Sequence, residues 1–356
     1  MEHILDNVMR EKNVERWSNA PGHRLAIGLI DKAGTRYWRN GQWLHEPDAA
    51  HAESLYEIGS ITKTMTGLLL AIGEQEGIWS GDNKLSELVP ELSGSPFASA
   101  TTLRQLATHS SGLPRMPGNF RATIKDNRNP YASYSDQHIT EAVLAEPPKS
   151  GNRHAYSNYG FGLLGWILAK RLNRSLSHAF SERLFQPLGM SNTLLRSGSP
   201  APAAGGLVPV YNAKGISVPH WDFQDTMAGA GAVCSTVPDM LHYLKTNLHP
   251  ENTPFPEAIA ECQREHYSIF ASRGIGVGYS WMFYKEQDGS TTHWHNGGTY
   301  GSSSFTAFNR DKGKGLVVLS NRGSGVWSQI PFIGKRKLSV DKLARMLLDG
   351  FYRMSD

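Results

Sequence analysis

Two residues three positions apart, Ser60 and Lys63, have the types and the spacing needed for nucleophilic catalysis. They begin a segment whose apolar residues recur at helical spacing, so both side chains should share one face of the first helical turn. The exposed N–H groups and the positive dipole end of a helix start disfavour an ammonium ion, as does partial burial. A neutral lysine amine beside a serine hydroxyl would activate that hydroxyl to form a covalent acyl-enzyme.

The same spacing has a purely structural alternative. Serine is a common N-cap, and a lysine three residues later is ordinarily a solvated charge. Ser-x-x-Lys occurs again at Ser339 and Lys342, where an acidic residue in the first turn indicates a plain helix cap. The catalytic interpretation of Ser60 therefore depends on matching chemistry elsewhere in the chain.

A second group of polar residues, Tyr156, Ser157 and Asn158, comes directly before an apolar helical segment. A phenol there can transfer a proton if a nearby cation lowers its pKa, and Lys63 could supply that charge. Asn158 could donate a hydrogen bond to a substrate carbonyl or orient Lys63. In the structural alternative, Asn158 caps the helix and Tyr156 is a packed aromatic residue.

A third group contains His293, His295, Gly297 and Gly298, where a strand-like run enters a glycine pair. Glycine lets a substrate backbone lie close to a strand edge, and its N–H can point at a developing oxyanion, so His295 would form a polar wall of the site. The two histidines share a strand face, but no third ligand at a recognisable spacing accompanies them, and no metal is expected. The alternative is that both are partly buried strand residues without a catalytic task, which we prefer for His293.

The elements that must position these groups change in type along the chain. Strand-like runs over 24–31 and 35–43 form a hairpin, and the helix that carries Ser60 follows. Helices are then expected at 101–109, 137–146, 158–172, 176–186, 237–248 and 255–267. Strand patterns return over 277–284, 291–295, 302–309 and 315–320, before a last helix over 338–354.

This order predicts an α/β fold of the α+β kind: an antiparallel β-sheet flanked by helices, with a mainly helical inserted lobe. We expect residues 1–77 and 274–356 to form the sheet lobe and residues 78–273 to form the helical lobe. The active site would lie in the cleft between them.

Composition narrows the classes of function. The chain has 356 residues, of which 39% are hydrophobic, and its net charge of +4 is spread out, which argues against nucleic-acid binding. No apolar run reaches transmembrane length. The N-terminus lacks the pattern of a signal peptide, so we expect a cytoplasmic protein if the chain is full length, and a periplasmic or secreted one if a leader was removed. The sequence indicates no oligomeric state.

The three groups occur in the order typical of penicillin-recognising serine hydrolases: Ser-x-x-Lys, then Tyr/Ser-x-Asn, then Lys/His-x-Gly. The sequence resembles in particular the class C β-lactamase-like group. That group includes class C β-lactamases, penicillin-binding D,D-peptidases, D-aminopeptidases and family VIII carboxylesterases. The resemblance covers nearly the whole chain and rests on six segments, 59–63, 103–114, 156–160, 187–190, 229–231 and 295–298.

Position by position, the resemblance implies that Ser60 is the nucleophile and that Lys63 and Tyr156 form the proton-transfer pair. Which of the two takes the first proton stays open, because they titrate as a coupled pair. Asn158 would contact the amide or ester side chain of the substrate. The oxyanion hole would consist of the backbone N–H groups of Ser60 and Gly298.

Two departures from the β-lactamase pattern bear on the substrate. His295 replaces the lysine that supplies a fixed positive charge to a β-lactam carboxylate, and Met116 falls about where β-lactamases carry a polar, amide-binding side chain. The resemblance therefore implies a carboxylesterase or a D-amino-acid-type peptidase or amidase, with a small-molecule ester, amide or D-amino-acid peptide as substrate and no cofactor. The alternatives are a class C-like β-lactamase, an acyltransferase and a non-catalytic penicillin-binding-like protein. In such families His109 belongs to a structural loop, so it is not included among the catalytic residues.

Overall fold

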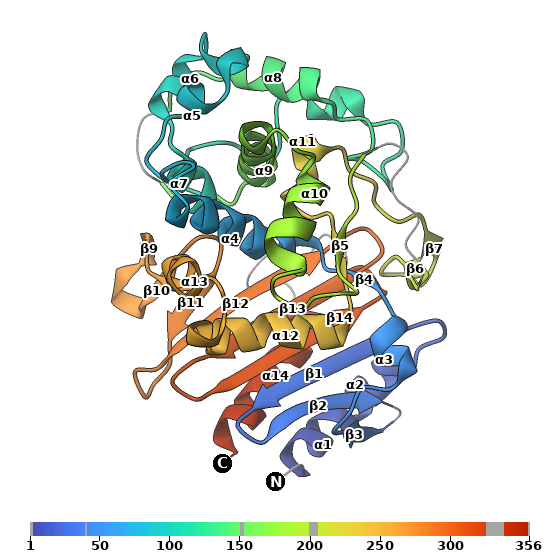
Figure 1. The fold of residues 1–356 in the computed structure, drawn as a ribbon. Helices are drawn as coiled ribbons and strands as arrows, with labels where there is room; N and C mark the ends of the chain where they lie inside the picture. Colours follow the sequence, from blue (N-terminus) through green and yellow to red (C-terminus); the bar gives the residue numbers. More distant parts are fainter. Residues whose placement is uncertain (1–2, 40, 150–152, 199–205, 325–337, 355–356) are drawn as a thin grey trace.

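A nine-stranded antiparallel sheet forms one half of the molecule, as Figure 1 shows in its lower part. The computed structural model describes residues 3–39, 41–149, 153–198, 206–324 and 338–354. In spatial order the strands are β3 (Gln42–Leu44), β2 (Gly34–Arg39), β1 (Leu25–Asp31), β14 (Lys314–Ser320), β13 (Ser303–Asn309), β12 (Thr291–Gly298), β11 (Met282–Lys285), β10 (Ile275–Val277) and β9 (Tyr267–Phe270). The two ends of the chain therefore build one sheet, with β1 paired to β14 at its centre.

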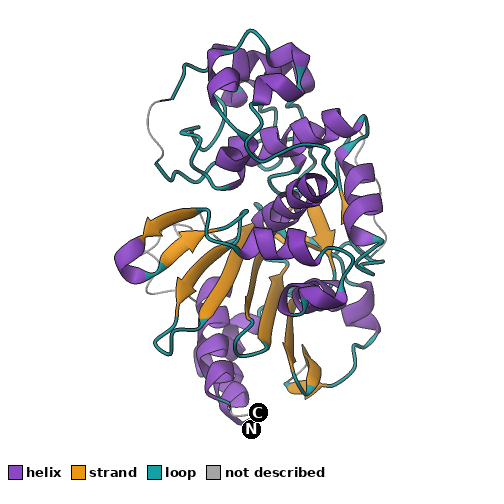
Figure 2. Ribbon diagram, turned by 60° about the vertical axis from the view of Figure 1, so that its left-hand side comes forward, coloured by secondary structure: helices purple, strands orange, loops and turns teal. Residues whose placement is uncertain are grey.

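Helices cover both faces of this sheet (Figures 1 and 2). The helices α1 (His3–Arg10), α2 (Lys12–Ser18) and α14 (Val340–Arg353) pack on one face, and α12 (Val237–Leu248) crosses the other. Successive strand residues point to opposite faces, so Ile27 and Leu29 of β1 join the core under α14, while Ala26 and Ile30 join the core under α12. Burial on both faces explains why β1 is apolar along nearly all of its length.

The middle of the chain is mainly helical and stacks above the sheet (Figure 1). Its helices are α3 (Ala49–Glu53), α4 (Thr62–Gln75), α5 (Leu85–Leu88), α6 (Pro96–Ala100), α7 (Leu103–Ala107), α8 (Asp136–Ala145), α9 (Asn158–Leu172), α10 (Leu176–Phe180), α11 (Asp225–Ala228) and α13 (Pro256–Gln263). Two small sheets accompany them, one of β4 (Tyr56–Glu57), β8 (Val233–Ser235) and β5 (Leu194–Leu195), the other of β6 (Val210–Tyr211) and β7 (Ser217–Val218). The predicted class, an antiparallel sheet flanked by helices, is confirmed.

Several boundaries differ from those expected from the pattern. The run over 277–284 is divided, because Ser280 has a φ of +70° and ends β10 before β11 begins. The helix expected over 255–267 ends at Gln263, and Tyr267 already starts β9, so the sheet begins before residue 274. The helix α12 lies within the range assigned to the helical lobe but packs on the sheet.

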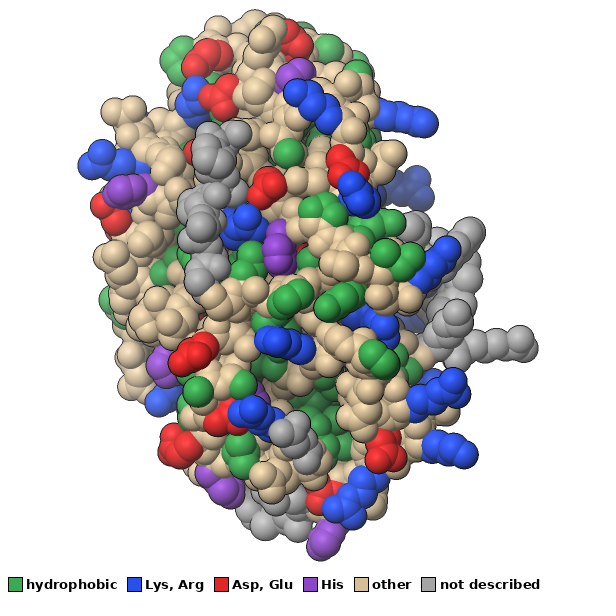
Figure 3. Space-filling view, turned by 90° about the vertical axis from the view of Figure 1, so that its right-hand side faces the viewer, with side chains coloured by type: hydrophobic (Ala, Val, Ile, Leu, Met, Phe, Trp, Pro, Cys, Tyr) green, Lys and Arg blue, Asp and Glu red, His purple; other side chains and the backbone are tan. Residues whose placement is uncertain are grey.

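Charged side chains of both signs are interspersed on the face drawn in Figure 3. No helix in the described part of the chain has the length and apolar character required to cross a bilayer.

Candidate active site

Ser60 lies in a short 3-10 turn, η1 (Gly59–Ile61), that leads directly into α4. The Lys63 Nζ lies 3.0 Å from the Ser60 Oγ, so the two side chains meet on one face as their spacing predicted. The Lys63 amine also donates to the backbone oxygen of Ala230, at 2.6 Å. Ala230 belongs to the segment 229–231, whose carbonyl therefore fixes the lysine against the serine.

Lys63 is completely buried. Burial lowers the pKa of its amine well below the ordinary value, and the nearby Arg115 guanidinium lowers it further. Desolvation favours the uncharged amine, which is the form that can accept a proton from a serine hydroxyl. The low pKa expected from the sequence thus arises mainly from burial.

Tyr156 meets the same centre from the loop before α9. Its phenol is near enough to the Ser60 side chain for that side chain to affect its pKa, and the Lys63 Nζ lies 5.1 Å from the centre of its ring. Burial raises the pKa of Tyr156 to about 12, opposed in part by the nearby Ser60 side chain and by the charge of Arg115. The hypothesis that a Lys63 cation lowers this pKa was wrong, because Lys63 is itself driven towards its neutral form and Arg115 is the cation that acts on the phenol.

The strand β12 packs its backbone directly against the turn that carries Ser60. A Cβ atom on Gly297 would lie 2.0 Å from the Ile58 oxygen, and one on Gly59 would lie 2.5 Å from the Gly298 nitrogen. Only glycine permits this approach at both positions, and Gly59 also has a φ of +50°. The glycines at these two positions thus let the backbone of β12 contact the turn that carries Ser60.

The Gly298 N–H faces the open edge of β12. The next residue, Thr299, donates its N–H to Ser302 on the β13 side, and donors alternate between the two sides of an antiparallel strand. On the other side, β11 pairs with β12 only as far as Trp294. An unpaired edge therefore runs past the Ser60 turn to Gly298.

Asn158 begins α9, while the N-cap hydrogen bond is made by Ser157, whose side chain accepts from the Gly160 N–H. The Asn158 amide nitrogen lies 3.3 Å from the Tyr131 hydroxyl and 3.7 Å from the Met116 sulfur. Its oxygen is buried without a protein partner in the described part of the chain. Met116 therefore does lie beside Asn158, and the capping role considered for Asn158 belongs to Ser157.

His295 is buried behind this centre, with only 2% of its surface exposed. Its Nδ1 lies 2.6 Å from the Asn296 oxygen, which can only accept, so Nδ1 carries the proton and Nε2 is an acceptor. Burial lowers the pKa of His295 to about 3, and the ring is therefore neutral. His293 is buried too and bonds the Gln263 oxygen, which agrees with the structural interpretation of that residue.

The sequence interpretation missed two residues that contact the site. Arg115 places its guanidinium carbon 5.3 Å from the centre of the Tyr156 ring, and Tyr131 contacts Asn158. Both come from the loop between α7 and α8, where no regular spacing exists to indicate them. The one feature of the sequence that could have indicated them is that Arg115 is adjacent to Met116.

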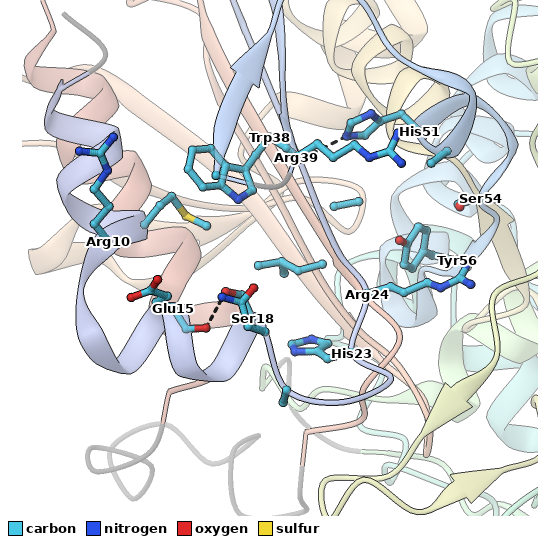
Figure 4. A pocket seen from close by; sticks show the side chains of 17 residues that line it. Arg10, Glu15, Ser18, His23, Arg24, Trp38, Arg39, His51, Ser54 and Tyr56 are labelled. Atoms are coloured by element: carbon cyan, nitrogen blue, oxygen red, sulfur yellow. Dashed lines mark hydrogen bonds between the residues drawn. The ribbon is translucent and has the colours of Figure 1, made fainter.

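A separate cavity of about 870 Å³ lies beneath the N-terminal hairpin (Figure 4). Arg10, Arg24, Trp38, His51 and Tyr56 are among its lining residues, whereas Ser60, Lys63 and Tyr156 are not. Within the described residues, no group of three or more histidine, cysteine, aspartate or glutamate side chains could hold a metal ion.

This fold and this arrangement of serine, lysine and tyrosine define a class of serine hydrolases. The family model described as beta-lactamase matches residues 25–330, and the chain belongs to that family. Among solved structures, a class C beta-lactamase from Rhodobacter sphaeroides has a TM-score of 0.75 at 20% identity, with 99% of each chain covered. Another class C beta-lactamase has a TM-score of 0.77 at 19% identity, with 99% of this chain and 97% of that chain covered. At these identities the likeness concerns the fold.

Curated relatives agree with the family assignment. A beta-lactamase of Providencia stuartii is 30% identical over 248 residues, which cover 70% of this chain and 59% of the relative. A beta-lactamase of Pseudomonas fluorescens is 24% identical over 335 residues, or 84% of this chain and 88% of the relative. Protein flp of Staphylococcus aureus strain MW2 is 25% identical over 311 residues, or 83% and 59%. The chain thus spans about three fifths of the length of two of these three relatives.

Proposed function

We propose that this chain hydrolyses a small ester or a D-amino-acid amide or peptide through an acyl-enzyme on Ser60. The observation that carries the proposal is the proximity of three groups from two distant segments. The Ser60 hydroxyl lies 3.0 Å from a buried amine, and its side chain is near enough to the partly buried Tyr156 phenol to affect the pKa of that phenol. Neither neighbour is charged in its favoured state, so a proton can move among the three without an unpaired buried charge at the start.

In the acylation step the Ser60 oxygen attacks the substrate carbonyl, and the serine proton passes to the neutral Lys63 amine. The oxyanion would be held by the N–H groups of Ser60 and Gly298, a contribution of about 3–4 kcal/mol for each donor. The leaving group departs with a proton supplied from Lys63 through the Tyr156 phenol. Water then attacks the acyl carbonyl and gives its proton to the same pair, and the bond from the acyl carbon to the Ser60 oxygen breaks as that oxygen takes the proton back, which releases the acid. The opposite pKa shifts of the amine and the phenol support Lys63 as the first acceptor.

The preference for an ester or D-amino-acid amide over a β-lactam rests on two positions. His295 is neutral and buried, so it offers a carboxylate no fixed charge. Beside Asn158 the neighbouring atoms are the Met116 sulfur and the Tyr131 hydroxyl, and the Tyr131 ring stacks on Phe223 at 4.7 Å. An acyl group that lies along Asn158 would therefore meet a largely apolar wall, which favours an alkyl or aryl acyl group.

A substrate panel tests the proposal. Purified protein is assayed with p-nitrophenyl butyrate, D-alanine p-nitroanilide, a D-alanyl-D-alanine peptide and nitrocefin, and acylation of Ser60 is read by intact mass. Ser60→Ala should abolish turnover of every substrate that the unchanged protein accepts.

The matched control is Ser339→Ala, at the second Ser-x-x-Lys of the chain. The Ser339 side chain caps α14 by accepting from the Lys342 N–H, so its loss should cost about 1 kcal/mol of stability and no activity. Undiminished hydrolysis in Ser60→Ala would remove this serine from its role. Faster turnover of nitrocefin than of any ester or amide would establish a β-lactamase instead, as the names of the relatives suggest.

A further inference from the structure

One residue left out of the catalytic set, His109, holds both neighbours of Tyr156. The Ala155 N–H donates to the His109 backbone oxygen at 2.8 Å, and the Ser157 N–H donates to the His109 Nδ1 at 3.1 Å. The residues immediately before and after Tyr156 are therefore both hydrogen-bonded to His109, one to its backbone oxygen and the other to its ring.

The His109 ring also covers the Tyr156 ring. The two ring centres lie 4.5 Å apart at an interplanar angle of 36°, and the centre of the Phe161 ring lies 4.9 Å from that of the imidazole. His109 is only 1% exposed, and its burial lowers the pKa of the ring well below the ordinary value. The imidazole thus stays neutral, with Nδ1 free of a proton and able to accept.

The backbone of His109 indicates that this contact is specific. His109 has a φ of +57°, a conformation that is uncommon for any residue other than glycine, although histidine and asparagine are enriched in it. Such a conformation persists where the surroundings determine it, and it concentrates at functional sites. Here it directs the carbonyl and the ring nitrogen of one residue at the N–H groups on either side of Tyr156.

We propose that His109 is a positioning residue that fixes the Tyr156 phenol against Ser60. The proposal rests on the function proposed above, since it assumes that Tyr156 takes part in proton transfer. His109 touches neither the Ser60 oxygen nor a substrate in this arrangement. Its loss should therefore lower the rate of the chemical step and leave substrate binding nearly unchanged, because a displacement of about 1 Å in a reacting group can cost ~10²-fold in rate.

Two variants separate the ring contact from backbone strain. His109→Gly accepts the left-handed conformation without strain but removes both the Nδ1 acceptor and the ring. His109→Asn also tolerates that conformation and returns a side-chain oxygen near the position of Nδ1. Asn173→Gly is the matched control, because Asn173 has a φ of +52° at the end of α9 and is exposed.

The readouts are kcat per active site, with active sites counted from the p-nitrophenol burst, and KM for the same ester. His109→Gly should lower kcat by about 10²-fold with KM changed less than about 3-fold, the range expected when acid–base transfer is impaired. His109→Asn should recover kcat to within about 10-fold of the unchanged protein, and Asn173→Gly should leave both constants unaltered. Crystal structures should show the Tyr156 ring displaced in His109→Gly and back in its original position in His109→Asn.

Normal kcat in His109→Gly with an undisplaced Tyr156 ring would overturn the proposal, as would equal losses in Gly and Asn. Failure of the underlying function has a different signature, namely that Ser60→Ala or Tyr156→Phe keeps full activity. The crystallographic comparison decides the positioning role even in that case, because it does not depend on turnover.

Discussion

Replacement of Gly59 by alanine tests the contact between the Ser60 turn and β12. A Cβ atom at Gly59 would lie 2.5 Å from the Gly298 nitrogen, about 0.9 Å short of the 3.4 Å at which ordinary contacts begin. The obstacle is backbone, so the strand or the turn must move apart by roughly that amount. A displacement of about 1 Å at reacting groups costs ~10²-fold in rate, and loss of one oxyanion donor costs ~10²–10³-fold. We therefore expect kcat/KM to fall by at least ~10²-fold.

The matched control for this variant is Gly77→Ala. Gly77 has a φ of +70°, and a Cβ atom there would meet nothing within 4 Å. Both variants carry the left-handed strain of alanine, about 1–2 kcal/mol, but only Gly59→Ala has the clash. Thermal melting measures the shared strain, and burst-normalised ester hydrolysis measures the displacement. If the two variants hydrolyse the ester equally fast, β12 does not supply an oxyanion donor at Gly298.

Three further outcomes follow from the charges around Ser60. Arg115→Gln removes a cation that lowers the pKa of Lys63, so the acidic limb of the pH profile of kcat/KM should move to higher pH. An acidic limb at the same pH would exclude Lys63 as the titrating base. Lys63→Met should abolish turnover. The unchanged protein should gain stability between neutral and alkaline pH, and the variant should lack that gain, which is measured as the difference in Tm between the two proteins at each pH. His295→Lys should lower the Tm and give no nitrocefin hydrolysis, because the new amine would be buried close to Lys63, and a gain in nitrocefin turnover would show that the side chain reaches the open edge.

The main elements of the fold and three of its site residues could be predicted because they follow local patterns. Strands such as β1 and β14 are apolar runs between turns, and α4 shows helical spacing directly after a Gly-Ser step. The order of motifs then brought Ser60, Lys63 and Tyr156 together, although their segments lie far apart in the sequence. Successive side chains of β12 point to opposite faces of the sheet, so Asn296 bonds Asp341 of α14 whereas His295 faces the site.

The surroundings of those residues depend on packing that no local pattern encodes. Arg115 and Tyr131 come from a loop, and their approach to Tyr156 and Asn158 is set by the path of the chain between α7 and α8. The depth at which His295 lies is likewise a result of the helices packed over the sheet. For this reason the sequence could indicate His295 as a candidate but not that it would be buried and neutral.

Burial acts on the amine and the phenol in opposite directions and drives both towards the uncharged form. An unfolded Lys63 titrates near 10.5, whereas the folded one titrates well below that value. Between the two pKa values the unfolded chain holds a proton that the folded chain lacks, so stability rises with pH through this window and is lowest below it. At neutral pH the protein therefore gives up folding free energy to keep a base beside Ser60. The close packing of α4, which is buried on nearly every side, offsets that loss and at the same time excludes the water that would restore the charge.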